Sequence, residues 1–279
     1  MAKNVVFTLT SGRSGTLYLS ALLRQNSKNC TVIHESYLHL NNPNMFGLPI
    51  YDHFAQNLEE IRKLVKQKNA AIQKYPLPIY IETSHSFLKS YWDIAPEFFP
   101  QMKLVHLIRN PVEVAKSEAN RETFINRWRL PFCYYRGRDH QRYFRWSLTG
   151  LEPIFESFDL AKLSLFQKYL IQWIEIENRA MAFLNRFNLH ASCMTLHTPM
   201  DLKDTQTIIQ LFHFLNIDAI VDEVKFPGIQ NRTPGKPTLI GDEERQQCRK
   251  IIESIPACYL EIFRYEPYAN CEWHELLKK

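Results

Sequence analysis

The sequence of 279 residues predicts an α/β fold: one domain of three layers, with helices covering both faces of a central parallel sheet. Two observations favour it. Short runs of β-branched and aromatic residues alternate with longer segments in which apolar residues recur at helical spacing. The first such run is followed by two glycines and then by a helical pattern, an order that aims backbone N–H groups at an anion. No repeat or linker divides the chain, so residues 1–279 are expected to form a single domain.

The predicted strands are short apolar runs, and the predicted helices have apolar residues three and four positions apart. The strands are expected at residues 5–9, 30–35, 78–83, 102–108 and 192–196. Helices are expected at residues 17–24, 54–73, 160–187, 205–215 and 242–255. A short helix is expected to end at residue 92. Another is expected to begin at Pro111, because proline suits the first turn of a helix. Residues 36–53 and 227–237 are expected to be loops.

The composition is that of an ordinary globular protein, with 45% hydrophobic and 23% charged residues. The net charge of +5 suits an anionic ligand but is too small to indicate nucleic acid. The first strand begins too near Met1 for a signal peptide, and no apolar run approaches the about 18 residues that span a bilayer. The six cysteines are scattered and the histidines show no metal-binding spacing. We therefore expect a cytoplasmic protein with reduced thiols, no bound metal and no membrane or nucleic-acid partner; its oligomeric state is open.

The loop after the first strand is the most informative stretch, Thr10-Ser11-Gly12-Arg13-Ser14-Gly15-Thr16. Its glycines let the backbone wrap around an oxyanion, Arg13 adds positive charge, and Ser14 and Thr16 add hydroxyl donors. A plain turn between strand and helix would not need these side chains. The loop also departs from the ATPase pattern G-x-x-x-x-G-K-[ST], because Thr16 stands at the lysine position and Leu17 at the metal-binding hydroxyl. The loop is interpreted as a phosphate or sulfate site.

A second anion-binding feature is expected where the fourth strand ends, at Arg109-Asn110-Pro111. Ser117 follows two turns into the next helix. An arginine at a strand end can hold a phosphate through charge-assisted hydrogen bonds. Taken alone, the pattern is equally compatible with an arginine that pairs with a surface carboxylate.

Together the two segments resemble the sulfotransferase family, whose donor is 3′-phosphoadenosine 5′-phosphosulfate (PAPS). The family's loop G-x-x-R-S-G-T-[TS]-x-L is similar to residues 10–19, and its motif R-[DN]-P-x-x-x-x-x-S matches Arg109 to Ser117. The helix around Trp173 and residues 208–217 are similar to later family elements. The resemblance implies that PAPS is the co-substrate and that no metal is required. It assigns the 5′-phosphosulfate to Gly12, Arg13, Ser14, Gly15, Thr16 and Leu17, the 3′-phosphate to Arg109 and Ser117, and closure over the nucleotide to Arg232 or Lys236.

The reaction that the resemblance implies is in-line transfer of a sulfuryl group to a hydroxyl or amine. Arg13 would stabilise the charge on the departing phosphate, and a base must take the proton of the acceptor. Glu35 is favoured by resemblance to relatives with a glutamate after this strand, His34 is next, and His85 is third. Because successive strand residues face opposite sides, only one of His34 and Glu35 is expected to face the cleft.

The acceptor is expected to be a small metabolite or natural product, as for a soluble bacterial-type enzyme. Thr83 and His197 depart from residues common in relatives, so no detailed acceptor pocket is carried over. Residues 127–146 are the most basic and aromatic part of the chain. The segment 127–150 is expected to act as a lid or acceptor-side wall together with the loop 36–53, although a nucleic-acid surface is conceivable.

Two other functions are compatible with an anion-binding α/β domain. One is a P-loop nucleotide kinase or NTPase, which the missing lysine and metal ligand disfavour. The other is a module that binds a phosphorylated nucleotide or RNA without catalysis, for which affinity would fall steeply with salt.

Overall fold

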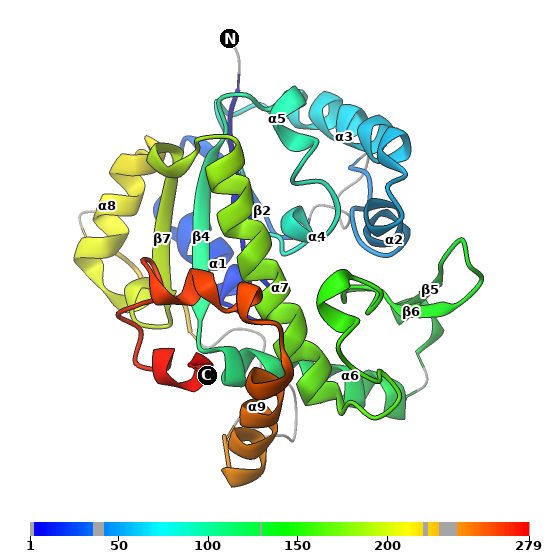
Figure 1. The fold of residues 1–279 in the computed structure, drawn as a ribbon. Helices are drawn as coiled ribbons and strands as arrows, with labels where there is room; N and C mark the ends of the chain where they lie inside the picture. The colour runs from blue at the N-terminus through cyan, green and yellow to red at the C-terminus, as the bar shows by residue number, and fades with distance from the viewer. Residues whose placement is uncertain (1–2, 36–41, 129, 220–222, 229–238, 279) are drawn as a thin grey trace.

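The computed structural model of the chain describes residues 3–35, 42–128, 130–219, 223–228 and 239–278. A five-stranded parallel sheet forms its centre, in the order β2–β3–β1–β4–β7 (Figure 1). The strands are β1 (Asn4–Leu9), β2 (Cys30–Ile33), β3 (Ile79–Glu82), β4 (Lys103–Arg109) and β7 (Cys193–Thr198). Each lies within or beside an apolar run predicted as a strand, and the predicted α/β fold with a parallel sheet is confirmed.

The central strand β1 pairs with β3 on one side and with β4 on the other. Phe7, for example, lies beside Glu82 of β3 and Leu104 of β4. After β1 the chain crosses to one half of the sheet, and after β3 it passes to the other half. In such sheets a ligand binds at the carboxyl ends of the strands, where the direction of winding changes. The glycine loop follows β1 at that position.

Helices cover both faces of the sheet, as predicted. Along β1, Val5, Phe7 and Leu9 pack with helices on one face, whereas Val6 packs with helices on the other. The first face carries α3 (Leu58–Gln73), α4 (Phe87–Ser90), α5 (Ala95–Phe98) and α7 (Leu165–Arg186). The second carries α1 (Thr16–Asn26) and α8 (Thr205–Leu215). Helices α6 (Pro111–Arg127) and α9 (Asp242–Ser254) pack against α7.

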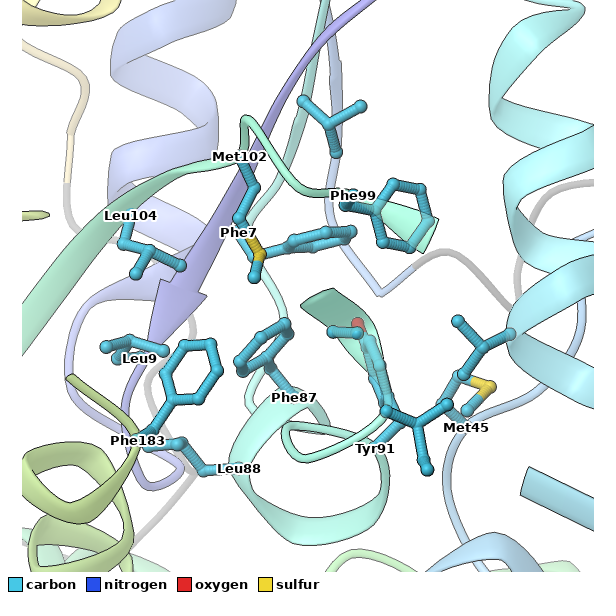
Figure 2. Close-up of a cluster of buried hydrophobic side chains, with 14 of the residues drawn as sticks. Phe7, Leu9, Met45, Phe87, Leu88, Tyr91, Phe99, Met102, Leu104 and Phe183 are labelled. Atoms are coloured by element: carbon cyan, nitrogen blue, oxygen red, sulfur yellow. The ribbon is translucent and has the colours of Figure 1, made fainter. Parts of the chain in front are cut away.

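An aromatic cluster fixes α4 against the sheet (Figure 2). The ring centre of Phe7 lies 5.2 Å from that of Phe87 and 5.1 Å from that of Phe99. Phe87 also meets Tyr91 and Phe183 edge to face. Such ring pairs add to the free energy of burying the rings themselves. The short helix α4, and the residues that lead into it from β3, are therefore held by the core.

Residues 48–54 form helix α2 (Leu48–Phe54), so the prediction of a loop over 36–53 is wrong for that part. The helix follows Gly47, which has a positive φ of 77°, and carries a proline in its first turn. Gln56, at φ 58°, separates α2 from α3, so the predicted helix 54–73 begins four residues later, at Leu58. The sequence suggested a loop because asparagines and prolines stand close to this short helix, whereas burial of its apolar side chains decides the outcome.

The long helix α7 begins at Leu165, five residues later than predicted. Ser164 caps it by accepting a hydrogen bond from the backbone of Gln167, whose side chain in turn accepts one from the backbone of Ser164. This capping box fixes the start of the helix, and residues 160–164 precede it.

The segment 127–150 contains an antiparallel hairpin of β5 (Tyr134–Arg136) and β6 (Arg142–Phe144). The hairpin is separate from the central sheet, on the right of Figure 1. Among the residues that the structure describes, no helix is long and apolar enough to span a membrane.

Candidate functional site

The loop between β1 and α1 ends at Gly15, which is the N-cap of α1 and has a left-handed φ of 97°. A Cβ atom at Gly15 would lie 3.1 Å from Leu202 Cδ1, so both the backbone and the space favour glycine. No side chain in the described part of the chain caps this helix terminus. The first N–H groups of a helix have no partner within the helix and attract anions. The sequence therefore places hydrogen-bond donors at the carboxyl edge of the sheet.

Gly12 lies against helix α6, where a Cβ atom would come within 1.8 Å of Glu118 Oε1. Glu118 is almost fully buried, and its Oε2 lies 2.6 Å from Arg121 Nη2. Glycine at this position thus lets the loop approach the Glu118–Arg121 ion pair, whose carboxylate is buried. The backbone carbonyl of Gly12 also accepts a hydrogen bond from Ser14 Oγ at 3.2 Å.

Replacing Gly12 with alanine is expected to destabilise the protein by about 1–3 kcal/mol, the usual cost of overpacking a buried site. The Glu118 carboxylate would have to move away from Arg121 to admit the new methyl group. The measurement is urea unfolding followed by circular dichroism. Gly228→Ala is the matched control, because a Cβ atom there has nothing within 4 Å. An unfolding midpoint equal to the wild type for Gly12→Ala would contradict the packing argument.

Arg13 and Arg109 join the two predicted anion-binding segments directly. Arg109 Nη1 donates a hydrogen bond to the backbone carbonyl of Arg13 at 3.0 Å. The Nε and Nη2 atoms of Arg109 donate to Glu113 Oε2 at 3.0 and 2.8 Å. Arg13 Nε donates to Ser117 Oγ at 2.8 Å. The adjacency of β1 and β4 thus brings both motifs to one side of the sheet.

A cleft of about 510 Å³, open to solvent, lies over this edge of the sheet. It is lined by residues from the loop and α1, from the ends of β2, β3 and β4, and from α6: Arg13, Gly15, Thr16, Leu17, Tyr18, His34, Glu35, His85, Arg109 and Arg121. Eight of these were predicted from the sequence as site residues. Tyr18 and Arg121 were not. The cleft combines cations with three potential proton-transfer groups.

Three other predicted site residues, Gly12, Ser14 and Ser117, are not among those that line the cleft. Ser14 is fully buried within the loop, where its hydroxyl donates to the carbonyl of Gly12 and lies 3.2 Å from Ser11 Oγ. Ser117 is nearly buried and holds Arg13. Arg232 and Lys236 lie outside the residues that the structure describes. The roles assigned to Ser14, Ser117, Arg232 and Lys236 in binding a nucleotide remain predictions.

A second pocket, of about 890 Å³, adjoins the cleft and shares Gly15, Tyr18 and Arg109 with it. Its remaining walls come from the end of β7 and from later segments: Thr198, Pro199, Leu202, Lys203, Pro227 and Gly228. Thr198 Oγ1 donates to the carbonyl of Ser14 at 3.1 Å, so the wall of this pocket is tied to the glycine loop. One elongated anionic ligand could therefore contact both spaces and Arg109 between them.

His34 and Glu35 both line the cleft, and the expectation that only one of them does is wrong. Strand β2 ends at Ile33, and Glu35 has a left-handed φ of 50°. The alternation of faces applies only within an extended strand, so it does not extend to these two residues. His34 Nε2 lies 3.9 Å from Glu35 Oε1.

The hydrogen bond of His34 fixes its tautomer. Its Nδ1 lies 2.7 Å from the carbonyl oxygen of Thr83, which can only accept. The neutral ring therefore carries its proton on Nδ1 and leaves the lone pair of Nε2 toward Glu35 and the cleft. Burial lowers the pKa of His34 below 6.5, with Glu35 opposing that change. The imidazole is thus neutral at pH 7.

His85 follows β3 and is almost fully buried at the floor of the cleft. Its Nε2 lies 3.6 Å from Glu35 Oε1, and its Nδ1 lies 3.0 Å from Lys89 Nζ. Burial, and then the charge of Lys89, lower the pKa of His85 to about 4. Burial also lowers the pKa of Lys89 to about 7. Lys89 is a buried cation beside the site that sequence reasoning missed.

Arg121 is the other cation that the sequence did not reveal. Besides its ion pair with Glu118, its guanidinium lies 5.6 Å from the ring centre of Phe144 and 5.2 Å from that of Trp146. Phe144 and Trp146 belong to the segment 127–150, so part of that segment packs directly behind the cleft. Arg121 stands four residues after Ser117 on α6, and this helical spacing is the signal that could have indicated it.

No protein-family model matches the sequence, and no curated protein matches it significantly. Among solved structures, the sulfotransferase from Alicyclobacillus acidocaldarius aligns with 96% of this chain and 99% of its own, with a TM-score of 0.52 and 14% identity. The chain has a sulfotransferase fold. The sulfotransferase domain of the olefin synthase from Synechococcus PCC 7002 aligns with 78% of this chain and 74% of its own, at 14% identity and a TM-score of 0.40. In this chain the glycine loop and the end of β4 lie side by side, joined by the hydrogen bond from Arg109 to the carbonyl of Arg13.

Proposed function

We propose that this chain transfers a sulfuryl group from PAPS to a hydroxyl or amine of a small molecule. The observation that carries the proposal is the convergence of the glycine loop, Arg13 and Arg109 on one cleft that also holds Glu35, His34 and His85. The chemistry of the cleft fits the donor, because cationic and N–H donors suit its anionic groups and the adjoining pocket offers room beside Arg109.

PAPS supplies an activated sulfuryl group, whose bond from sulfur to the 5′-phosphate oxygen breaks as the bond to the acceptor forms. Arg13 and the first N–H groups of α1 stabilise the negative charge that develops on the departing phosphate oxygen. Glu35 takes the proton that the acceptor loses, and His34 is the alternative base, since its Nε2 lone pair faces the same space. Arg109 and Ser117 are assigned to the 3′-phosphate.

A binding experiment separates this function from its rivals. Thermal stabilisation by 3′-phosphoadenosine 5′-phosphate (PAP), but not by ATP with Mg²⁺, is expected for a sulfotransferase. The reverse pattern would indicate a kinase or NTPase. Stabilisation by neither, with RNA affinity that falls steeply with salt, would indicate a binding module. Transfer is then tested by incubating the protein with ³⁵S-labelled PAPS and a panel of small phenols, alcohols and amines in the presence of EDTA.

Replacing Arg109 with glutamine is expected to weaken the binding of PAP by about 10- to 100-fold, the range for losing a charge-assisted hydrogen bond. Adenosine 5′-phosphosulfate lacks the 3′-phosphate, and its affinity is expected to change little. Isothermal titration of wild type and variant with both ligands measures the difference. An equal loss of affinity for the two ligands would show that Arg109 does not bind the 3′-phosphate.

A further inference from the structure

His85 is held on three sides and presents one nitrogen to the cleft. The ring of Phe46 lies against it, with centroids 4.7 Å apart. The glycine loop closes its edge, where a Cβ atom on Gly12 would lie 3.6 Å from His85 Cε1. Lys89 Nζ meets Nδ1 at 3.0 Å. Nε2 is buried, its ring lines the cleft, and the carboxylate oxygen Glu35 Oε1 lies 3.6 Å from it.

The surrounding fold holds the side chain of Lys89 in one position beside His85. Its side chain is completely buried, and Nζ donates a hydrogen bond to the backbone carbonyl of Trp146 at 2.6 Å. The residue lies on α4, which the aromatic cluster holds against the sheet. A lysine ammonium has three donors and no acceptor, so the imidazole nitrogen that it meets must offer a lone pair. The proton of neutral His85 then resides on Nε2.

We propose that Lys89 is a positioning residue that holds His85 as the Nε2–H tautomer, so that His85 donates a hydrogen bond into the cleft rather than accepting a proton there. The identity of the hydrogen-bond acceptor rests on the proposed function: in that function the acceptor is an oxygen of the sulfuryl group. His85 is thereby removed from the candidates for the base. His34, whose Nδ1 donates to Thr83, carries the opposite tautomer on the facing wall.

The charges around the pair favour this arrangement. Glu35 and Arg121 face His85 together with Lys89, and Glu118, Arg121, Glu35 and Arg179 surround Lys89. Glu118 and Glu35 stabilise the ammonium form, whereas burial and the two arginines oppose it. The low pKa of His85, about 4, keeps its ring neutral at pH 6. Because the pKa of Lys89 is about 7, the ammonium prevails at pH 6 and is lost as the pH rises above 7.

The direct test is ¹⁵N NMR of the full-length protein labelled at its histidine rings, at pH 6 and without ligand. The two ring nitrogens have distinct shifts when protonated and unprotonated, and a His85→Gln variant assigns the signals. We expect a protonated Nε2 and an unprotonated Nδ1 for His85, and mixing of the tautomers in Lys89→Met. A protonated Nδ1 in the wild type would overturn the proposal. This result does not depend on whether the chain transfers sulfate, so it separates failure of the inference from failure of the function.

The kinetic test compares two replacements of His85, using ³⁵S-labelled PAPS and the acceptor from the panel that gives the highest turnover. Glutamine keeps an N–H donor near the position of Nε2, whereas alanine has none. For a donor, His85→Ala is expected to lower kcat by about 100- to 1,000-fold, with His85→Gln within about 10-fold of the wild type. Equal losses in the two variants would overturn the donor role. Lys89→Met is expected to lower kcat while KM for PAPS stays within about twofold, and unchanged kcat in a folded Lys89→Met protein would also overturn it.

Discussion

Replacing Arg13 with glutamine is expected to lower kcat for sulfuryl transfer by about 100- to 1,000-fold, the effect of removing one donor from a preorganised oxyanion site. Arg13 lines the cleft beside the N-terminus of α1, and its Nε is held by Ser117. Burial lowers the pKa of Arg13 while Glu118 opposes this, and an arginine remains charged in either case. The guanidinium therefore brings a fixed positive charge to the departing phosphate without having to reorganise.

Glutamine is the informative replacement because position 13 has a left-handed φ of 59°. Glycine would change the backbone preference there as well as the charge, and alanine would remove the whole side chain, whereas glutamine retains a side chain of similar length. Arg13→Lys, which keeps the charge but not the planar fork, is expected to lie between the wild type and glutamine. Arg249→Ala, on the exposed side of α9, is the control for loss of a positive charge elsewhere. Rates for Arg13→Gln within a factor of three of the wild type would contradict the assigned role.

Replacing Glu35 with glutamine is expected to lower kcat by about 100- to 10,000-fold, the contribution usual for general base catalysis. The amide is close in shape to the carboxylate, so the left-handed turn after β2 and the contacts of the side chain are largely preserved. The binding of PAP is expected to change little, because the loss concerns proton transfer rather than the nucleotide. Stopped assays with labelled PAPS and thermal shifts with PAP measure the two effects separately.

Glu60→Gln, which removes an exposed carboxylate on α3, is the matched control. His34→Gln distinguishes the second candidate. If turnover were lost in His34→Gln and retained in Glu35→Gln, the base would be the imidazole. The rate of the wild type would then fall as the pH drops through a pKa below 6.5, since burial disfavours the protonated ring. Loss of turnover in Glu35→Gln together with retention of turnover in His34→Gln supports the carboxylate.

The anion loop could be predicted from the sequence because everything that defines it is local. A strand, two glycines and a helix are contiguous in residues 4–26, and the left-handed φ of Gly15 follows from the turn that connects them. The Arg109 motif is equally local, since Asn110 caps α6 and Pro111 occupies its first turn. Short-range propensities and the absence of a Cβ atom act within a few residues, so they can be recognised without knowledge of the rest of the fold.

The arrangement of proton-transfer groups could not be predicted in the same way. The alternation rule failed at His34 and Glu35 because the strand ends at Ile33, two residues earlier than predicted, a boundary that its pairing with β3 decides. Lys89 and Arg121 are single charged residues on helices, where an exposed position is the ordinary expectation. Lys89 is buried and Arg121 is partly buried because α4 and α6 pack beside the end of the sheet and Trp146 contacts both residues.

Residue patterns alone predicted the parallel α/β architecture, the loop with its glycines and Arg13, and the arginine at the end of β4. Contacts between distant segments, which the residue patterns did not predict, bring Arg109 to the backbone of Arg13, His34 and Glu35 to one cleft, and Lys89 to His85. The physical reason is the range of the interactions. Backbone preferences and helix capping depend on neighbours in the chain, whereas the pairing of buried charges and the choice of an imidazole tautomer depend on groups brought together from distant segments.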